Sequence, residues 1–384
     1  MEHAEEVRLI ERALAALSGG SPELGPGSAA NPIECYLSEE WLAREREVLF
    51  RRFPLAVGFS SQVARPGEFL SHDASGTPIL VVRGRDGVLR AFVNACRHRG
   101  VRLVSEAAGR GKRELVCPFH GWTYGADGQL LQIPGAEGFP DLDRSERPLV
   151  PLPVTERFGL VFAVPTPWET GFDFDRFLGP PLGDLSDLGL SEFMMVRPTT
   201  RTRALNWKLY LDATHEVYHL STLHGTTAGA GYFGNLGLHD CFPPHARIVL
   251  PSKSLLELPG TDPAGWRLLD HAGILYSVFP NTTLLVHSGF VQVLSSFPAG
   301  VDSAVLQAGM LVPKGPVDAD EAALRQFHYD TYWKTMEEDL AMCESTQSSL
   351  RSGANAELLF GRYEHVLAEY HAAVRAALEG RLVP

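Results

Sequence analysis

The chain has 384 residues, 45% of them hydrophobic and 21% charged, and this length favours two globular domains over one. The formal net charge of −12 and the absence of a basic stripe argue against a nucleic-acid-binding protein. No apolar run reaches the roughly 18 residues of a membrane span, and the acidic first residues are unlike a signal peptide. We therefore expect a cytoplasmic protein that binds neither nucleic acid nor membrane.

The first predicted element is an amphipathic helix over residues 3–18, in which apolar residues recur on one side at helical spacing. Ser18, Gly19 and Gly20 end it, and a stretch rich in glycine, proline and serine continues to about Pro32. Such a stretch is typical of a linker. We expect residues 1–40 to form an N-terminal helix and linker that pack on the C-terminal domain.

Short apolar runs separated by turns then predict an all-β domain over residues 41–165. Strands are expected at residues 68–70, 79–82, 89–93, 115–116, 130–132 and 160–164. Two motifs lie at strand ends in this domain: Cys96-Arg97-His98-Arg99-Gly100 and Cys117-Pro118-Phe119-His120-Gly121-Trp122.

Each motif pairs one cysteine with one histidine, which makes Cys96, His98, Cys117 and His120 candidate metal ligands. Two cysteines and two histidines can bind tetrahedral zinc, and they are also the ligands of a Rieske [2Fe-2S] cluster. Zinc fingers usually place both cysteines in one half of the site and both histidines in the other. Here each half contributes one of each, so the split favours the iron–sulfur cluster, with a structural zinc site as the alternative.

Glycine follows the histidine closely in both motifs, at Gly100 and Gly121. Glycine permits close approach of the backbone to the cluster, and we expect these two amides to donate hydrogen bonds to sulfur. Five cysteines in a chain of this length give no disulfide framework. The three outside the motifs, Cys35, Cys241 and Cys343, are expected to be buried thiols.

Residues 166–384 mix strand and helix patterns and predict a second domain. Strands are expected at residues 255–258, 274–279, 283–286, 291–297 and 305–312. Apolar residues then recur at spacings of three and four over residues 319–350 and 355–379, as in helices that pack on a sheet.

The most unusual part of this domain concentrates three histidines and two acids in the thirteen residues that begin at Asp212. Glu216 and His219 are three residues apart and would share a helix face. His219 and His224 are five apart, which on a regular helix turns the second ring away by about 140°. If both rings bind one metal, the helix must end or bulge between them.

Two imidazoles and one carboxylate form the ligand set of non-haem Fe(II) oxygenases, so a further acid is required. Asp339, in a late predicted helix, is the best candidate. Glu337 and Glu338 are expected to point elsewhere, although Asp330 and Glu338 are the alternatives if Asp339 is not the ligand.

The chain resembles the alpha subunits of the Rieske non-haem iron oxygenases, the ring-hydroxylating family, over nearly its whole length. The family has loops reading Cys-X-His-Arg-Gly and Cys-Pro-X-His-Gly-Trp. Asn-Trp-Lys follows, then an acid, two residues, His, four residues, His, and a late Asp followed by Glu-X-X-Gln. All of these occur here, between Cys96 and Gln347. The resemblance implies an α+β fold, with an all-β Rieske domain and a helix-grip catalytic domain, an antiparallel sheet with a long C-terminal helix.

The resemblance also implies the ligands: Cys96, His98, Cys117 and His120 for the [2Fe-2S] cluster, and His219, His224 and Asp339 for a mononuclear Fe(II). Glu216 would bridge to a cluster histidine of a neighbouring subunit in a homotrimer. Many dioxygenases of the family have Asp at that position, whereas similar Glu residues occur in members that act on quaternary amines and other non-aromatic substrates. His215 is unusual for the family and is expected to pack or to meet solvent, with a hydrogen-bonding role beside Glu216 as the alternative.

The implied activity is that of a terminal oxygenase, an oxidoreductase that uses O₂ to hydroxylate or oxidatively demethylate a small organic substrate. Electrons would come from NAD(P)H through a separate ferredoxin or flavin reductase, since the sequence has no dinucleotide-binding fingerprint. The alternatives are a Rieske electron-transfer or redox-sensing protein without oxygenase activity, and a zinc-stabilised ligand-binding protein.

The substrate class stays open between aromatic compounds and quaternary amines, because aromatic walls suit both. The expected pocket walls are Thr226, Tyr232, Phe233, Phe242, Tyr276, Phe279, Asn281, His287 and Phe290.

Overall fold

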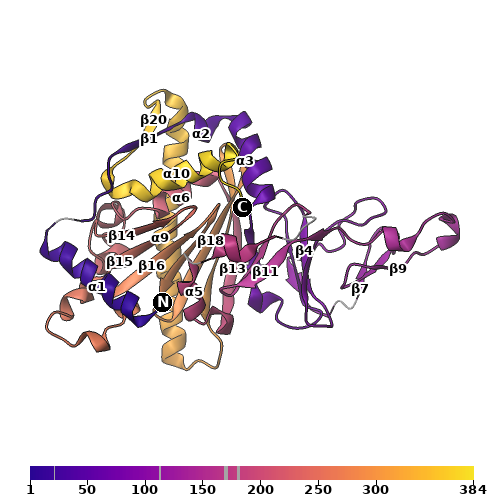
Figure 1. The fold of residues 1–384 in the computed structure, drawn as a ribbon, viewed down its shortest axis with the longest axis horizontal. Coiled ribbons are helices and arrows are strands. Elements are labelled where there is room, and N and C mark those ends of the chain that lie inside the picture. Colours follow the sequence, from indigo (N-terminus) through magenta and orange to yellow (C-terminus); the bar gives the residue numbers. More distant parts are fainter. Residues whose placement is uncertain (21, 112–113, 168–171, 180–181) are drawn as a thin grey trace. The chain divides into compact units, whose positions relative to one another are not determined.

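The computed structural model describes residues 1–20, 22–111, 114–167, 172–179 and 182–384, and the chain divides into two compact units (Figure 1). One unit is Arg46–Phe177. The other combines Met1–Glu45 with Leu178–Val383. Among the helices of the described residues, none has the length and apolar character needed to cross a membrane.

The Arg46–Phe177 unit is built from small antiparallel sheets, as predicted. In its described part the strands pair in the orders β10-β5-β4-β3-β6, β11-β12-β2 and β7-β8-β9. The strands are β2 (Leu55–Phe59), β3 (Phe69–His72), β4 (Ile79–Arg83), β5 (Leu89–Val93), β6 (Ala108–Gly109), β7 (Glu114–Val116), β8 (Thr123–Gly125), β9 (Leu130–Gln132), β10 (Pro151–Leu152), β11 (Val154–Arg157) and β12 (Leu160–Ala163). Buried Phe69, Leu80, Trp122 and Tyr124 belong to one core cluster, which also includes both motif cysteines. The two Cys-His motifs lie in the loops that follow β5 and β7.

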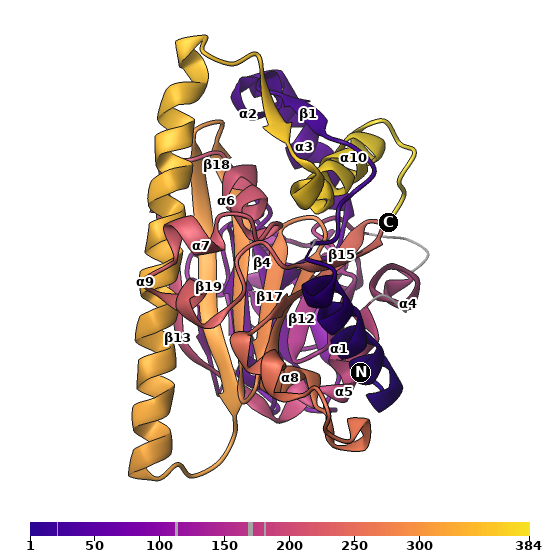
Figure 2. The same cartoon turned by 90° about the vertical axis from the view of Figure 1, so that its left-hand side faces the viewer.

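The other unit contains a seven-stranded antiparallel sheet in the order β13-β19-β18-β17-β16-β15-β14, which confirms the predicted sheet-and-helix fold. Its strands are β13 (Phe193–Arg203), β14 (Leu238–Phe242), β15 (His245–Pro251), β16 (Ala272–Val278), β17 (Thr282–His287), β18 (Phe290–Gly300) and β19 (Ser303–Pro313). The long helix α9 (Ala319–Ser349) runs beside this sheet (Figure 2). Arg203 of β13 bonds Glu337 and Glu344 of α9 at 2.6 and 2.9 Å, so ion pairs hold the helix along the edge strand.

Two predicted elements of this unit are wrong. The strand expected at residues 255–258 is replaced by a short 3₁₀ helix, Lys253–Glu257, which ends just before Leu258. The predicted helix over 355–379 is divided into β20 (Glu357–Phe360) and α10 (His365–Leu378), and β20 pairs with β1 (Ala29–Pro32) in the segment expected to be a linker. An apolar run such as Leu358-Leu359-Phe360 suits either a helix or a strand, and here a strand from the other end of the chain decides the outcome.

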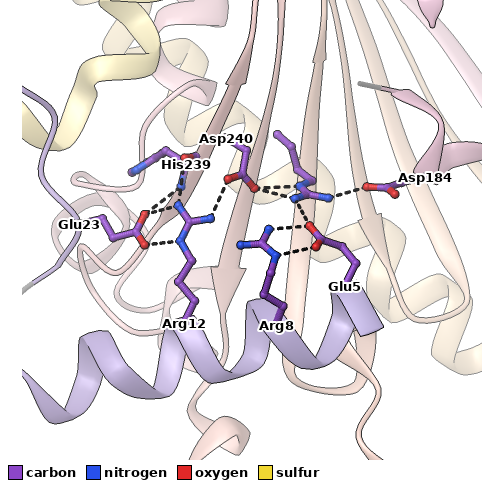
Figure 3. Close-up of polar contacts among 8 residues, drawn as sticks. Glu5, Arg8, Arg12, Glu23, Asp184, His239 and Asp240 are labelled. Carbon is purple, nitrogen blue, oxygen red and sulfur yellow. Dashed lines mark hydrogen bonds and ion pairs between the residues drawn. The ribbon is translucent and has the colours of Figure 1, made fainter. Parts of the chain in front are cut away.

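The predicted N-terminal helix is α1 (His3–Ser18), which contacts the edge strand β14 of the seven-stranded sheet and buries Leu9, Ile10 and Ala13. Figure 3 shows charged side chains from α1 meeting others from the sheet. Arg12 of α1 bonds Asp240 of β14 at 2.7 Å, and the buried Arg247 of β15 bonds the same carboxylate at 2.7 Å. Arg247 also bonds Glu5 of α1 at 2.6 Å and Asp184 at 2.5 Å. Hydrogen bonds between charged groups are stronger than those between neutral groups. This network therefore attaches α1 firmly to one face of the sheet.

Candidate metal centres

The two Cys-His loops have the same backbone geometry. In each, the cysteine amide donates to the carbonyl oxygen five residues later, at 2.8 Å, and a glycine amide donates back to the cysteine carbonyl, at 2.9 Å for Gly100 and 3.0 Å for Gly121. Both glycines have positive φ, +77° and +70°, which explains why glycine is needed there. In the structure these two amides close the turns, and a hydrogen bond from them to cluster sulfur stays a prediction.

The side chains of the two loops converge. Cys96 and Cys117 are buried, whereas His98 is half-buried and His120 is exposed, with their ring centres 4.8 Å apart. Burial raises the pKa of the Cys96 thiol, and the nearby Cys117 raises it further. Two thiols held together in an apolar interior are readily ionised when a metal cluster supplies positive charge. Paired sulfurs inside and paired imidazoles outside fit a Rieske [2Fe-2S] cluster.

Aromatic side chains support this arrangement. The ring of His98 stacks on that of Trp122, with centres 4.9 Å apart and planes within 7°, and Phe139 meets His98 edge-on at 5.7 Å. The hydroxyl of Tyr124 lies 3.4 Å from the sulfur of Cys96. Trp122 is part of the second Cys-His motif, whereas nothing in the sequence distinguishes Tyr124 or Phe139 from ordinary core residues.

The second constellation has a different helical geometry from the one predicted. Helix α6 (Trp207–Thr214) ends before Glu216, so Glu216 and His219 lie in an irregular segment and do not share a helix face. The expected helix end between His219 and His224 is confirmed, since the single helical turn α7 (Leu220–Leu223) begins after His219 and ends before His224. Each histidine is at an end of this turn, outside regular helix, and their rings approach to 5.0 Å.

His219, His224 and Asp339 come together. Their ligand atoms all lie within 4.8 Å of one another, with Oδ1 of Asp339 at 2.8 Å from Nε2 of His224 and 3.6 Å from Nε2 of His219. Figure 2 shows α7 next to α9, the helix that carries Asp339. Asp330 bonds Gln326 instead, on an exposed part of α9. Two imidazoles and one carboxylate with open positions fit the facial ligand set of a non-haem iron.

A carboxylate lies behind each of these imidazoles. Glu216 contacts Nδ1 of His219, and Oε2 of Glu338 lies 2.7 Å from Nδ1 of His224. The expectation that Glu338 points elsewhere is therefore wrong, whereas Glu337 does point away, to Arg201 and Arg203. Residues 338 and 339 are neighbours on one helix, and the ring of His224 is long enough to touch both.

These carboxylates make the centre attractive to a cation. Burial lowers the pKa of His224, but Asp339 and Glu338 together raise it above its usual value. Burial raises the pKa of Glu338, but hydrogen bonds from His224 and Thr227 bring it below its usual value. A metal ion at this centre would take the place of the proton that these carboxylates attract to His224.

The neighbouring polar residues have structural roles. His215 is fully buried, and neither ring nitrogen has a hydrogen-bond partner among the described residues. It packs on the ring of Tyr370 at 5.0 Å, and burial lowers its pKa to about 4, so the packing interpretation of His215 is confirmed. Asp212 is also buried, accepting a hydrogen bond from the hydroxyl of Tyr36 at 2.6 Å and lying 2.8 Å from Nε2 of His371.

Two of the predicted pocket walls are wrong, because Tyr276 and Phe242 lie on the opposite face of the sheet. Tyr276 interacts with Arg247 and Asp184 on the face covered by α1. Phe242 lies under the guanidinium of Arg247, 5.8 Å from it. Aromatic character alone does not reveal the face of a strand, which depends on the register of each residue.

Tyr232 and His287 lie on the metal side of the sheet. The Tyr232 hydroxyl is 3.3 Å from Nδ1 of His287, and both would contact a side chain added at Gly273. Gly273 shares a face of β16 with Leu275, which belongs to an apolar cluster. That cluster consists of Val217, Ala246, Ile248, Leu275 and Val366, with Leu220, Cys241, Leu250 and Leu285 beside it. Val217 and Leu220 come from the segment that carries His219.

Comparisons with known proteins agree with these two centres. Residues 53–146 match the Rieske [2Fe-2S] domain, and residues 190–380 match the family described as ring hydroxylating alpha subunit (catalytic domain). The carnitine monooxygenase oxygenase subunit of Acinetobacter baumannii is 26% identical over 364 residues, covering 88% of this chain and 94% of that protein. The glycine betaine monooxygenase oxygenase subunit of Pseudomonas aeruginosa is 32% identical over 193 residues, covering 50% of this chain and 44% of that protein.

Among solved structures, the quaternary ammonium Rieske monooxygenase CntA has the same fold, with a TM-score of 0.78 and 24% identity over 91% of this chain and 96% of that one. The paired Cys-His loops, the two histidines with an acid from the long helix and the two family matches all lead to one conclusion. The chain belongs to the alpha subunits of the Rieske non-haem iron oxygenases, the oxygenase components that combine a [2Fe-2S] cluster with a mononuclear iron.

Proposed function

We propose that His219, His224 and Asp339 bind the mononuclear Fe(II), and that Cys96, His98, Cys117 and His120 bind the cluster. The observation that carries the proposal is the convergence of two imidazole nitrogens and one carboxylate oxygen, from separate elements, within 4.8 Å. A ferrous ion in that position would supply the open coordination positions that O₂ chemistry requires. The protein would hold the ion by three ligands on one side and place the substrate near the open side of the ion.

The proposed substrate is a small quaternary ammonium compound that is oxidised at a carbon next to nitrogen. Carnitine and glycine betaine monooxygenases are among the similar proteins. Carboxylates also gather here: besides Asp339, Glu216 contacts His219 and Glu338 contacts His224. Burial raises the pKa of a fourth carboxylate, Glu364, and the charge of Glu216 raises it too. The four carboxylates Asp339, Glu216, Glu338 and Glu364 carry more negative charge than a bound divalent ion and the nearby Lys334 supply in positive charge. The site therefore favours a cationic substrate.

Electrons are proposed to arrive from NAD(P)H through a separate ferredoxin or flavin reductase, since the sequence has no dinucleotide-binding fingerprint. The oligomer is proposed to be a homotrimer, in which the cluster of one subunit serves the iron of the next. In this arrangement Glu216, whose carboxylate contacts His219, would also accept a hydrogen bond from a cluster histidine of the partner subunit.

Glu216→Gln is expected to slow electron transfer between the two centres by at least about tenfold while leaving both centres loaded with iron. The amide keeps the size of the side chain but removes the charge that makes the hydrogen bond to an imidazole strong. The measurement is the rate of cluster oxidation in a single turnover of reduced enzyme with substrate and O₂. A rate equal to that of the unaltered protein would rule out the bridging role.

The substrate proposal is tested by O₂ uptake with NADH and a compatible reductase. Carnitine, glycine betaine and related quaternary amines are compared with benzoate and chlorobenzene at equal concentrations, and O₂ uptake must depend on the added compound. We expect the quaternary amines to be consumed. Consumption of the aromatic compounds alone would show a ring-hydroxylating enzyme, and a protein with two irons per chain and no uptake would be an electron carrier.

A further inference from the structure

We propose that Glu338 is a positioning residue for His224: its carboxylate holds the ring in the orientation and tautomer that direct Nε2 to the iron. The inference rests on the proposed function, because it assumes that His224 is a metal ligand. It adds a residue that the sequence pattern does not reveal, since Glu338 was expected to point away from the centre.

The contacts define the position of the carboxylate closely. Oε2 of Glu338 is 2.7 Å from Nδ1 of His224 and accepts a hydrogen bond from the hydroxyl of Thr227, also at 2.7 Å. The Thr227 amide donates to the carbonyl oxygen of His224 at 2.9 Å. The turn after α7 therefore fixes Thr227 relative to His224. His224 is only 1% exposed, which leaves its Nδ1 little access to solvent as another partner.

The chemistry follows from the two nitrogens of imidazole. A neutral ring carries one N–H, and a metal needs the lone pair of the other nitrogen. An acceptor at Nδ1 keeps the proton there and leaves the lone pair on Nε2, which faces Asp339 at 2.8 Å. A carboxylate also increases the basicity of the ring more than a neutral acceptor does, which strengthens its bond to the metal.

The long helix thus supplies two carboxylates with different tasks. Asp339 faces Nε2 of both histidines, and Glu338 faces the opposite edge of one of them. Because the two residues are consecutive on α9, a rigid element sets the distance between them. The carboxylate of Glu338 bonds Nδ1, on the edge of the ring opposite Nε2, so it does not reach the position of the third ligand. Asp339 fills that position instead.

The test compares Glu338→Ala and Glu338→Gln with Glu337→Ala, a matched control whose side chain bonds Arg201 and Arg203 instead. The purified proteins, with their clusters intact, are loaded with Fe(II), and its loss to a chelator is followed. We expect Glu338→Ala to weaken Fe(II) binding about 10- to 100-fold, as is usual when such a partner is removed. Glu338→Gln should recover part of the affinity, since its amide oxygen still accepts the Nδ1 proton.

A spectroscopic measurement separates positioning from general damage. Nitric oxide binds the mononuclear Fe(II), and the symmetry of the resulting paramagnetic signal reports the ligand geometry. We expect Glu338→Ala to change that symmetry and Glu337→Ala to preserve it. If Glu338→Ala does not fold, Glu338→Gln and Thr227→Val carry the test, each with weakened Fe(II) binding expected.

The outcomes distinguish this inference from the proposed function. If the unaltered protein binds no iron beyond the cluster, the proposed function fails. If it binds that iron and Glu338→Ala, Glu338→Gln and Thr227→Val all match Glu337→Ala in affinity and signal, only the role of Glu338 is overturned.

Discussion

His224→Ala is expected to abolish O₂-dependent turnover while leaving the cluster and its colour intact. His224 is almost completely buried and contacts both Asp339 and Glu338, so no neighbouring group can take its place. A catalytic metal stabilises charge by several kcal/mol, and about 1.4 kcal/mol corresponds to a tenfold change in rate, so turnover should fall at least about 10³-fold. Iron content should fall from about three to about two atoms per chain.

The experiment measures iron, the visible spectrum of the cluster and substrate-dependent O₂ uptake on the same preparation. His271→Ala is a suitable control, because His271 is a histidine of the same unit that bonds Ser254 at 3.0 Å rather than the metal centre. It should retain about three irons. A His224→Ala protein that keeps the third iron and turns over normally would place the oxygen chemistry elsewhere.

Glu45→Ala is expected to destabilise the protein by about 3–5 kcal/mol, because it leaves a buried charge without its partner. Glu45 is 0% exposed, and its Oε1 lies 2.7 Å from Nζ of Lys208, which is buried as well. Its carboxylate also accepts hydrogen bonds from the indole N–H groups of Trp207 at 2.8 Å and Trp41 at 3.0 Å. Three donors therefore lose their acceptor in one substitution.

Urea denaturation measures the loss. Glu47→Ala, on the same helix α3 (Glu39–Arg52) but exposed, should change the free energy of unfolding by no more than about 0.5 kcal/mol. The double substitution Glu45→Leu with Lys208→Leu should recover much of the stability, since it removes both charges. If Glu45→Ala is no more destabilising than Glu47→Ala, the buried pair contributes nothing to folding.

The Asn-Trp-Lys motif owes part of its pattern to this pair. Asn206 caps α6 by accepting a hydrogen bond from the Lys208 amide at 3.1 Å, while Trp207 and Lys208 both reach Glu45. In the sequence, Asn206 and Trp207 stand out only as part of the family's Asn-Trp-Lys motif. Their partner in the N-terminal segment could not be found, since no spacing relates Glu45 to a residue 163 positions later.

The prediction from sequence was most complete where function depends on local spacing. Each Cys-His loop is closed by its own hydrogen bonds and its own positive-φ glycine, so six consecutive residues carry the information for half of the cluster site. The predicted strands of the Arg46–Phe177 unit were found for the same reason, because alternation and turn residues act over short distances.

Long-range packing decided the rest. The partner of β20 is β1. The partners of His224 are two neighbouring acids on α9, of which the sequence favoured Asp339 as the ligand and kept Glu338 only as an alternative ligand. Likewise, the register of β14 to β16 placed Phe242 and Tyr276 on the face of the sheet away from the metal. The sequence by itself indicated the family and the residues proposed for the two centres. Only the tertiary structure determined which face, which partner and which carboxylate serves each centre, since those choices depend on contacts between residues far apart in the chain.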